Sequence, residues 1–552
     1  MFGNLTMDRY RISALALLTY VACLGSPPAH AGTCPKRPVP GSVVSNPLAL
    51  YSTKGVLTAA FTLRSEVANY LEECYIYLGG GNGAVEAPTL HLNPGDELEL
   101  SLTNRLTYVP PPPPTKRSAI TDMAKMSNMG KMPAAAQGAA TTHDPCDGGT
   151  MVATSTNIHF HGLNIPPVCH QDEILNTDIE NTDPAFQYQF RVPLNDAPGM
   201  YWYHPHLHGE TTLQVNGGAA GALIVDGMQN VKPQVAGLPE RVFIIRQQFT
   251  NPNSWVAGPY QLTLNYQPAA APLPSPVIQV QPGAREFWRV ANASSQAFLN
   301  LAVSFGDTQQ PLEIIALDGI PVTTSSTVTS IALPPAGRAE FIVTGPPAGQ
   351  AAIFQQLGFD TGPIGNPNGT QTLAVIQATS SAIEPPAIPA AHPKDVAAVP
   401  QRFAGLIAQT PTAHRKIYFA EATNGSNGPT EFFITVDGQT PKLFSMSDPP
   451  AITTTVGAVE DWNVENRTGE THAFHIHQIH FLFMAVNGVT QPDPQLRDTV
   501  IVPAWSGTGP YPSVTLRMDF RDPEIAGTFV FHCHVLDHED AGMMQKIQVN
   551  PK

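Results

Sequence analysis

Polar and apolar residues alternate strictly over residues 97–102, which read Glu-Leu-Glu-Leu-Ser-Leu. Successive side chains of a β-strand point to opposite faces, so this pattern predicts a strand with one face buried and the other in water. Gly95 stands just before the run and marks the turn that starts the strand. Asn104 follows at its end.

The same outline occurs three times along the chain, each time as a Gly, an alternating strand and an Asn nine positions after the Gly. The copies begin at Gly95, Gly283 and Gly457, at intervals of 188 and 174 residues. Three copies at nearly equal spacing predict three domains of one type, each a Greek-key β-sandwich. The expected boundaries are 32–228, 229–379 and 413–552, with a Pro- and Ala-rich linker over 380–412 for which a disordered segment is the alternative.

The composition favours an all-β protein. The chain has 55 Pro and 44 Gly among 552 residues and no long run of helical period, which is typical of many strands joined by turns. A net charge of -15, with scattered Lys and Arg, argues against a nucleic-acid surface. After the N-terminal segment no apolar run approaches the roughly 20 residues of a transmembrane helix.

The first 31 residues have the pattern of a signal peptide. Arg9 and Arg11 precede an apolar run over 12–25, and residues 29–31, Ala-His-Ala, have the form of a cleavage site. No two Arg are adjacent, so general secretion is favoured over twin-Arg export, and we expect a periplasmic or secreted protein. Residues 21–23, Val-Ala-Cys, weakly resemble a lipoprotein site, which makes lipid anchoring at Cys23 the weaker interpretation.

Histidine pairs of the form His-x-His recur in the outer domains. On a strand the two imidazoles of such a pair share one face, about 7 Å apart at the backbone, and can hold neighbouring metal ions. One pair alone is a weak signal, but clustering strengthens it. The outer domains together contribute His159, His161, His204, His206, His475, His477, His532 and His534. The middle domain has no His and no Cys, so we expect it to act as a spacer.

A second kind of metal motif lies near the C-terminal end, where His532-Cys533-His534 is followed by His538 and Met543. On a strand Cys533 points to one side and its two His neighbours to the other. A soft thiolate with His538 and a weak axial Met543 suits an electron-transfer copper, while the imidazoles behind it suit a second copper centre. One strand would then serve two metal sites.

Four Cys remain once Cys23 is assigned to the signal peptide and Cys533 to copper. An even number in an exported protein predicts two disulfides, and four Cys allow three pairings. We expect Cys146 to pair with Cys169, bracing the loop after a metal motif, and Cys34 to pair with Cys74.

The four motifs, in this order, resemble those of the multicopper oxidases, the family of laccases, ascorbate oxidases, bilirubin oxidases and bacterial cuprous oxidases. The resemblance covers essentially the whole mature chain and implies three cupredoxin-like domains and four copper ions per chain. It implies a type 1 copper on His472, Cys533, His538 and Met543, and a type 2 copper on His159 and His475. It implies a type 3 pair on His161, His204, His206, His477, His532 and His534. His208 and His480 match no family ligand.

The resemblance also implies the reaction, in which a small reductant gives single electrons to the type 1 site and O2 is reduced to water at the shared site. Glu539, directly after His538, matches a family acid that relays protons, with a surface acid as the alternative. Asp172 matches an acid near the type 2 copper, although Glu173 is adjacent. Glu470 is near enough to orient a substrate, but we interpret it as a turn residue.

The reducing substrate is left open between phenols or aromatic amines, as for a laccase, and Cu(I), as for a cuprous oxidase. An insertion over 108–150 carries Met123, Met126, Met129 and Met132, whose thioethers favour Cu(I). The alternatives are an amphipathic turn that covers apolar surface and low-complexity filler. A non-catalytic copper-sequestering protein is a further alternative, because a fold does not fix a function.

Overall fold

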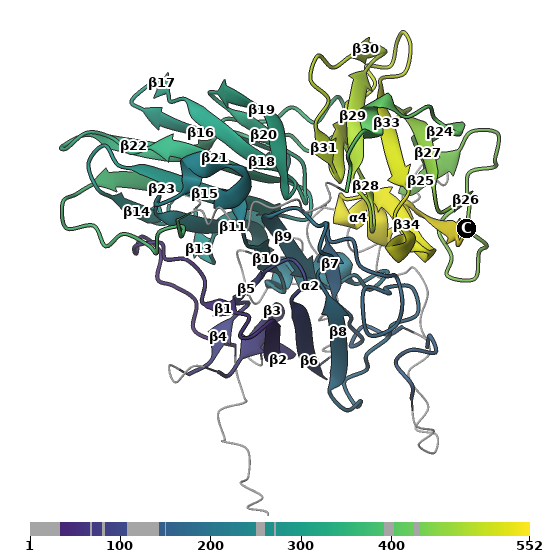
Figure 1. Cartoon of the computed structure of the whole chain (residues 1–552), viewed down its shortest axis with the longest axis horizontal. Helices are drawn as coiled ribbons and strands as arrows, with labels where there is room; N and C mark the ends of the chain where they lie inside the picture. The colour runs from purple at the N-terminus through teal and green to yellow at the C-terminus, as the bar shows by residue number, and fades with distance from the viewer. Residues whose placement is uncertain are drawn as a thin grey trace, which may run out of the picture. The chain divides into compact units, whose positions relative to one another are not determined.

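The computed structural model describes residues 34–66, 69–79, 83–107, 143–149, 151–249, 260–269, 272–390, 402–423 and 430–552. The expected signal peptide, the four Met of the insertion and residues 391–401 of the linker lie outside these ranges. In the described part of the chain the strands form six sheets, which pack in pairs as three sandwiches (Figure 1).

The first sandwich holds two sheets of five strands. One has the order β1 (Ala49–Tyr51), β5 (Thr89–Leu92), β10 (Gly221–Val225), β9 (Gly199–His204), β7 (His159–His161). The other has the order β4 (Val85–Glu86), β3 (Asn69–Tyr77), β2 (Val56–Glu66), β6 (Glu97–Arg105), β8 (Phe186–Arg191). Alternate side chains of both sheets, such as Leu98 and Leu223, bury one shared core.

The second sandwich is built in the same way from two larger sheets. One has the order β13 (Gln267–Pro268), β12 (Tyr260–Leu264), β11 (Glu240–Phe249), β15 (Arg285–Ala293), β21 (Arg338–Thr344), β18 (Leu312–Leu317), β19 (Ile320–Val328). The other has the order β14 (Val277–Val280), β23 (Gln371–Ala378), β22 (Ala351–Gln356), β16 (Leu299–Phe305), β17 (Thr308–Gln309), with β20 (Ile331–Leu333) also beside β16. Its core centres on Trp288 and Phe341.

The third sandwich contains the C-terminal strands. One sheet has the order β25 (Thr430–Val436), β24 (Ala413–Thr423), β27 (Ala458–Asn466), β33 (Ser513–Phe520), β29 (Phe481–Val486), β30 (Val489–Thr490), with β31 (Leu496–Arg497) also beside β29. The other has the order β26 (Ile452–Thr455), β35 (Met544–Asn550), β34 (Gly527–Cys533), β28 (His472–Ile476), β32 (Thr499–Val502). Cys533 and Met543 belong to its core.

Helices are short in the part of the chain that the structure describes. They are α2 (Thr211–Gly217), α3 (Met228–Val231), α4 (Leu536–Asp540) and the 3-10 turns Pro233–Val235, Leu406–Ala408 and Pro523–Ile525. No helix among these residues combines the length and the apolar character needed to cross a membrane. The predicted all-β class is confirmed.

The sequence repeat marks one strand in each sandwich. β6, β15 and β27 each pair in parallel with one neighbour and antiparallel with the other. The strand just before the repeat, which is β5, β14 or β26, pairs in parallel with the last strand of its sandwich. The three sandwiches thus share one topology, as the repeat predicted.

The Asn at the end of each repeat fixes the loop that follows. Asn104, Asn292 and Asn466 are fully buried, and each Oδ1 accepts the N–H of the residue two positions later. Each Nδ2 donates to carbonyl oxygens of neighbouring loops, as Asn466 does to Glu470 and Pro503. Buried amides need such partners, which explains why this position of the repeat is polar.

The ends of the predicted linker lie against the sandwiches. Ile388 packs with Met228 and Val235, and its N–H donates to Leu238. Leu406 packs with Val459 and Leu482 of the third sandwich. These contacts fix the segment near both ends, while most other side chains of residues 380–390 and 402–412 are exposed.

Candidate metal centres

A compact sulfur and imidazole cluster lies inside the third sandwich. Cys533 Sγ is 3.5 Å from His472 Nδ1 and 3.9 Å from His538 Nδ1, and the two Nδ1 atoms are 3.3 Å apart. All three side chains are buried. Met543 is also fully buried, and its backbone carbonyl accepts the N–H of Cys533. The structure therefore brings together all four residues of the expected type 1 site within one core.

Strand pairing explains how these side chains meet. β28 and β34 are antiparallel neighbours with Phe474 opposite Cys533 and His475 opposite His532. Alternation along β28 places His472 on the same face as Phe474 and turns His475 to the other face. His538 comes from α4, which follows β34 directly. The strand pair thus serves the sandwich core on one face and a second site on the other.

The second site gathers the eight His of the outer sandwiches. In the first sandwich β7 pairs with β9, so that His159 stands opposite His204 and His161 opposite Trp202. Phe160, between the two His, points into the core. All eight are buried: His159, His161, His204, His206, His475, His477, His532 and His534. In β7 both His of the pair lie on one face of the strand, as expected. In each of the other three pairs the first His lies in a strand and the second lies just beyond its end.

Three of the eight converge on one point. The Nε2 atoms of His206, His477 and His532 lie 3.2–3.3 Å from one another. Without a metal ion, nothing favours three imidazole nitrogens that point at one another. A shared metal ion explains the arrangement. The ring of His534 lies 5.2 Å from that of His161 and 5.6 Å from that of His204, so these form a second group of three beside the first.

The donor atoms fit copper. Buried nitrogens without a hydrogen-bond partner among the described residues include His159 Nε2, His161 Nδ1, His204 Nε2, His475 Nε2 and both ring nitrogens of His534. Burial lowers the pKa of all eight imidazoles, to about 4 for His206 and His532, so the rings are neutral and their lone pairs are available. Buried polar atoms without partners are costly, and a bound metal satisfies them.

Both predicted acids lie beside the eight His. Asp172 is buried, its carboxylate is 2.9 Å from His159 Nδ1, and it accepts the N–H of Phe160. Glu539 is fully buried, with Oε2 3.0 Å from His532 Nδ1 and Oε1 3.5 Å from His206 Nδ1. Such contacts fix the ring orientation of a metal ligand. The alternative of Glu539 as a surface acid is wrong, because the side chain is buried.

The other candidates have clear positions. Glu173 Oε1 and Oε2 accept backbone N–H groups of residues 175–177, so it stabilises a turn. His208 lies against Phe444. His480 donates through Nε2 to the carbonyl of Asp318. Glu470 is not a plain turn residue, because its Oε1 lies 3.1 Å from His538 Nε2.

Three residues near the centres went unnoticed in the sequence. Asp498 contacts His161, Glu421 lies 3.5 Å from His472 Nε2, and the Thr468 hydroxyl is 2.8 Å from the same nitrogen. Burial alone would raise the pKa of Asp498, but the charge of Arg338 holds it well below its usual range. The motifs carry no signal for these partners. Glu421 lies on β24, Asp498 lies between β31 and β32, and Thr468 lies in the loop before β28.

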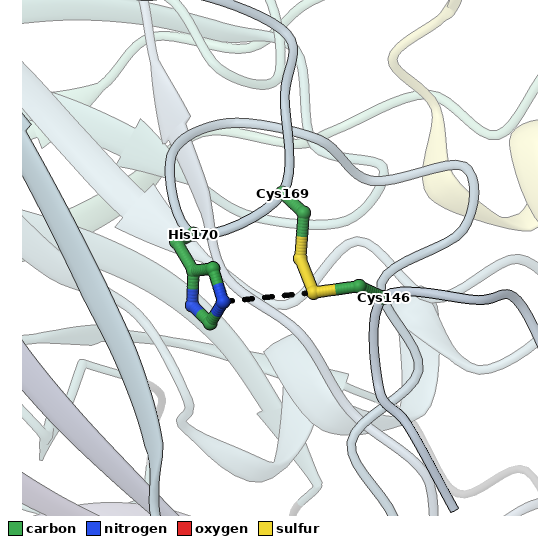
Figure 2. Close-up of side chains that lie close together, drawn as sticks. All are labelled: Cys146, Cys169 and His170. Carbon is green, nitrogen blue, oxygen red and sulfur yellow. Dashed lines mark hydrogen bonds between the residues drawn. A yellow bond between two sulfur atoms is a disulfide. The ribbon is translucent and has the colours of Figure 1, made fainter.

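Both expected disulfides are present, Cys34 with Cys74 and Cys146 with Cys169 (Figure 2). His170 lies beside the second, with Nε2 3.7 Å from Cys146 Sγ, and its Nδ1 donates to the carbonyl of Gln187. The bridge and this hydrogen bond hold the loop that carries Asp172; the sequence predicted the bridge but not the hydrogen bond.

Known proteins resemble this chain in sequence. Sequence models of multicopper oxidase domains match residues 150–230, 244–381 and 415–552, more than half of the chain. The multicopper oxidase mco of Staphylococcus haemolyticus is 24% identical over 414 residues, covering 72% of this chain and 77% of the relative. The laccase of Bacillus subtilis is 23% identical over 433 residues, covering 71% and 79%.

Solved structures agree on the fold. A multicopper oxidase from Campylobacter jejuni, described as a metallo-oxidase, has a TM-score of 0.64 at 22% identity and covers 95% of this chain and 98% of its own. McoA of Aquifex aeolicus has a TM-score of 0.63 at 18% identity, with 92% and 99% covered. The expected cupredoxin-like fold is confirmed. The chain belongs to the multicopper oxidase family, the copper-dependent oxidoreductases that use O2 as electron acceptor.

Proposed function

We propose that this protein is an exported, laccase-like oxidase that takes single electrons from phenols or aromatic amines and reduces O2 to water. One observation carries the proposal: Cys533 lies in the type 1 cluster, while its chain neighbours His532 and His534 lie among the eight His. A storage protein has no need of two sites joined through one strand. Membership of an oxidase family likewise favours the enzyme over a copper-sequestering protein.

We assign four copper ions per chain. The type 1 ligands are His472, Cys533, His538 and Met543, and the type 2 ligands are His159 and His475. The type 3 ligands are His161, His204, His206, His477, His532 and His534. The convergence of three Nε2 atoms and the unpaired nitrogens of the remaining rings support this division.

The residues around the centres have separable roles. Copper supplies one-electron redox chemistry and the binding of O2. Cys533 would join the two sites through its own backbone, because its neighbours in the chain are His532 and His534, two of the proposed ligands of the second site. The sandwich core around Cys533 keeps water from the thiolate.

Glu539 and Asp172 are the proposed carriers of protons to the oxygen site. Each carboxylate contacts a ring nitrogen of a proposed ligand, and each is buried. Glu539 can hold a proton between His532 and His206, on the side of α4. Asp172 receives hydrogen bonds from Phe160 N–H and Gln478 Nε2, which keep it against His159.

The organisation proposed for the whole chain follows the sequence prediction. We propose a signal peptide at 1–31, cupredoxin domains at 32–228, 229–379 and 413–552, a linker at 380–412, and a periplasmic or secreted location. The domain limits are supported by the strands of each sandwich, which fall within these ranges. Two disulfides suit an oxidising compartment.

A substrate panel tests the activity. Copper-loaded protein is given a substituted phenol, an aromatic amine or Cu(I), and O2 consumption is recorded beside the visible absorption of the type 1 copper. We expect turnover with the organic reductants. A protein that shows the type 1 absorption yet consumes no O2 with any reductant would contradict the proposal.

A metal-ion oxidase is the second candidate, because two carboxylates cap the type 1 cluster. Glu421 faces His472 Nε2 and Glu470 faces His538 Nε2, and both side chains are about one-seventh exposed. Burial and the neighbouring Glu421 raise the pKa of Glu470 to about 9, so Glu421 is the carboxylate that carries the charge. An anionic oxygen suits a metal cation better than a neutral phenol. Glu421→Gln should then depress Cu(I) oxidation more than phenol oxidation.

Deleting residues 123–132 tests the Met insertion in the same assay. Unchanged Cu(I) turnover in the deletion variant would exclude a role of these Met in Cu(I) oxidation.

A further inference from the structure

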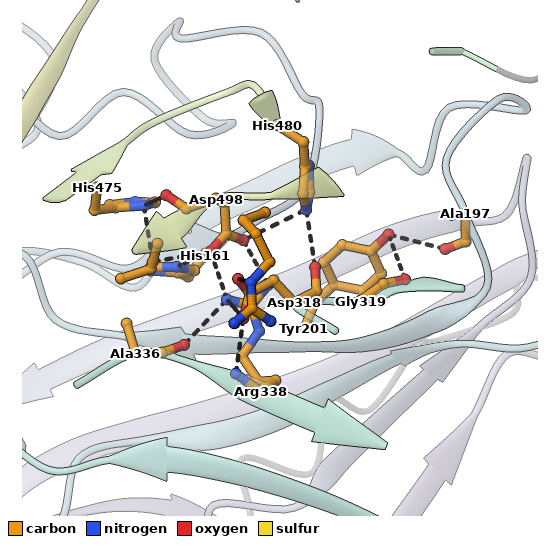
Figure 3. A network of polar contacts seen from close by, with 12 residues as sticks. His161, Ala197, Tyr201, Asp318, Gly319, Ala336, Arg338, His475, His480 and Asp498 are labelled. Carbon is orange, nitrogen blue, oxygen red and sulfur yellow. Dashed lines mark hydrogen bonds and ion pairs between the residues drawn. The ribbon is translucent and has the colours of Figure 1, made fainter. Parts of the chain in front are cut away.

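A buried arginine of the middle sandwich lies where all three sandwiches meet (Figure 3). Arg338, the first residue of β21, has no solvent exposure. Its Nη1 and Nη2 donate to the two carboxylate oxygens of Asp498 at 2.8 and 2.5 Å. Its Nε donates to the carbonyl of Met200 in β9 at 3.2 Å. One guanidinium therefore ties the third sandwich and the first to the middle one.

Asp498 in turn holds two of the proposed copper ligands. Its Oδ1 accepts from His161 Nε2 at 3.3 Å, and its backbone carbonyl accepts from His475 Nδ1 at 2.9 Å. These bonds fix the tautomers, so His161 offers Nδ1 and His475 offers Nε2, the atoms that lack partners. The two rings stack at 4.0 Å. The orientation of one ligand from each outer sandwich thus depends on one residue.

The close approach of this ion pair requires the glycine after the first His-x-His motif. A Cβ at Gly162 would lie 2.7 Å from Arg338 Nη2 and 2.8 Å from Asp498 Oδ2. Its φ of 91° is also one that other residues rarely adopt. Any side chain here would push the pair away from His161.

Further charged groups close the network. Asp318 Oδ1 accepts the backbone N–H of Arg338 at 2.9 Å, and Arg497 Nε lies 3.6 Å from Asp318 Oδ2. His480 Nε2 donates to the Asp318 carbonyl at 2.8 Å. The positive charges of the two Arg match the negative charges of Asp318 and Asp498. Arg338 therefore keeps its two parallel hydrogen bonds to Asp498.

We propose that Arg338 is a positioning residue of the oxygen-reducing site, acting through Asp498 on His161 and His475. The middle sandwich, which has no His of its own between His208 and His392, thereby sets the geometry of copper ligands held by its neighbours. This inference rests on the proposed assignment of these two His as copper ligands.

The test compares Arg338→Gln with Arg241→Gln. Arg241 makes a buried two-bond pair with Glu286 inside the same sandwich, so it matches the burial and charge of Arg338. The readouts on full-length protein are copper bound per chain, the EPR signal of the type 2 copper, and the melting temperature. We expect Arg338→Gln to weaken copper retention at the shared site about 10- to 100-fold and to change the type 2 signal. Arg241→Gln should lower the melting temperature with an unchanged signal.

The inference is overturned if the Arg338→Gln signal and copper content equal those of Arg241→Gln. Should Arg338→Gln yield no folded protein, Arg338→Lys decides, because Lys keeps the charge but cannot make two parallel bonds. A wild-type signal in Arg338→Lys overturns the inference, and an altered signal supports it. Failure of the proposed function is distinct, because wild-type protein would then lack the copper signals or consume no O2.

Discussion

At the scale of single residues, position along one strand separates the two copper environments. Cys533 faces the sandwich core with His472, while His532 and His534 face the junction of the outer sandwiches. Burial raises the pKa of the Cys533 thiol well above its usual range, so the thiolate depends on a bound metal. The metal and the thiolate are therefore mutually dependent at this position.

Cys533→Ser should abolish the type 1 visible absorption and lower O2 consumption below about one-hundredth of wild type. The eight His are unchanged in this variant, so the EPR signal of the type 2 copper should persist. Absorption, EPR and copper content are measured together. Met543→Leu is the matched control, because it keeps the thiolate and should raise the reduction potential while activity persists. Retained oxidase activity in Cys533→Ser refutes the assignment.

Glu539→Gln should lower turnover about 10- to 100-fold with copper content unchanged, because Gln keeps the size but cannot take up or release a proton beside His532 and His206. The measurement is the rate at which O2 reoxidises the fully reduced protein. Glu524→Gln, an exposed acid of the same sandwich, serves as control. A Glu539→Gln protein that reoxidises as fast as the control argues against any role for Glu539.

At the scale of elements, the sequence predicted what is local and periodic. Alternation over 97–102 identified β6, and His-x-His spacing identified the shared face of His159 and His161 on β7, because a strand fixes side-chain direction by parity. Partners from distant strands were not predictable. Arg338 and Asp498 are 160 residues apart, and nothing in either local pattern indicates the other.

The contact between β3 and α2 gives a pH-dependent prediction. Burial, with a smaller effect of Glu210, raises the pKa of Glu73 to about 8, while an unfolded Glu ionises near about 4.3. The folded protein keeps this proton over a range in which the unfolded chain has lost it. The contribution of Glu73 to the free energy of unfolding should therefore be greatest below about pH 4.3, fall as pH rises, and level off above about pH 8.

Glu73→Gln removes this dependence. We expect wild type and variant to have similar unfolding free energies near about pH 4, and the variant to be more stable near about pH 9, by on the order of 5 kcal/mol. Urea unfolding at both pH values measures the difference. Glu99→Gln, an exposed acid on β6, should show no such change. Parallel pH profiles for wild type and Glu73→Gln would exclude a raised pKa at Glu73.

At the scale of the whole molecule, three separate cores are joined by smaller contacts. The Asp540 carboxylate of the third sandwich accepts N–H groups of Gly209, Thr211 and Thr212 at the start of α2. Ile174 and Leu175 pack with Val530 across the same junction. The eight His link the outer sandwiches through the proposed copper ions. Four His come from each outer sandwich, so the shared site is complete only when both are docked.

After removal of copper, the two outer sandwiches should therefore unfold in separate transitions. Copper bound to the folded protein alone raises stability by mass action, and a site shared by two sandwiches makes them unfold together. We expect calorimetry of chelated protein to show a lower melting temperature and at least two transitions, and the copper-loaded protein to show a merged one. Copper-loaded Cys533→Ser, which keeps the eight His, should stay merged. If chelated and loaded proteins melt in one identical transition, the metal does not hold the outer sandwiches together, and contacts such as Asp540 with α2 must do so alone.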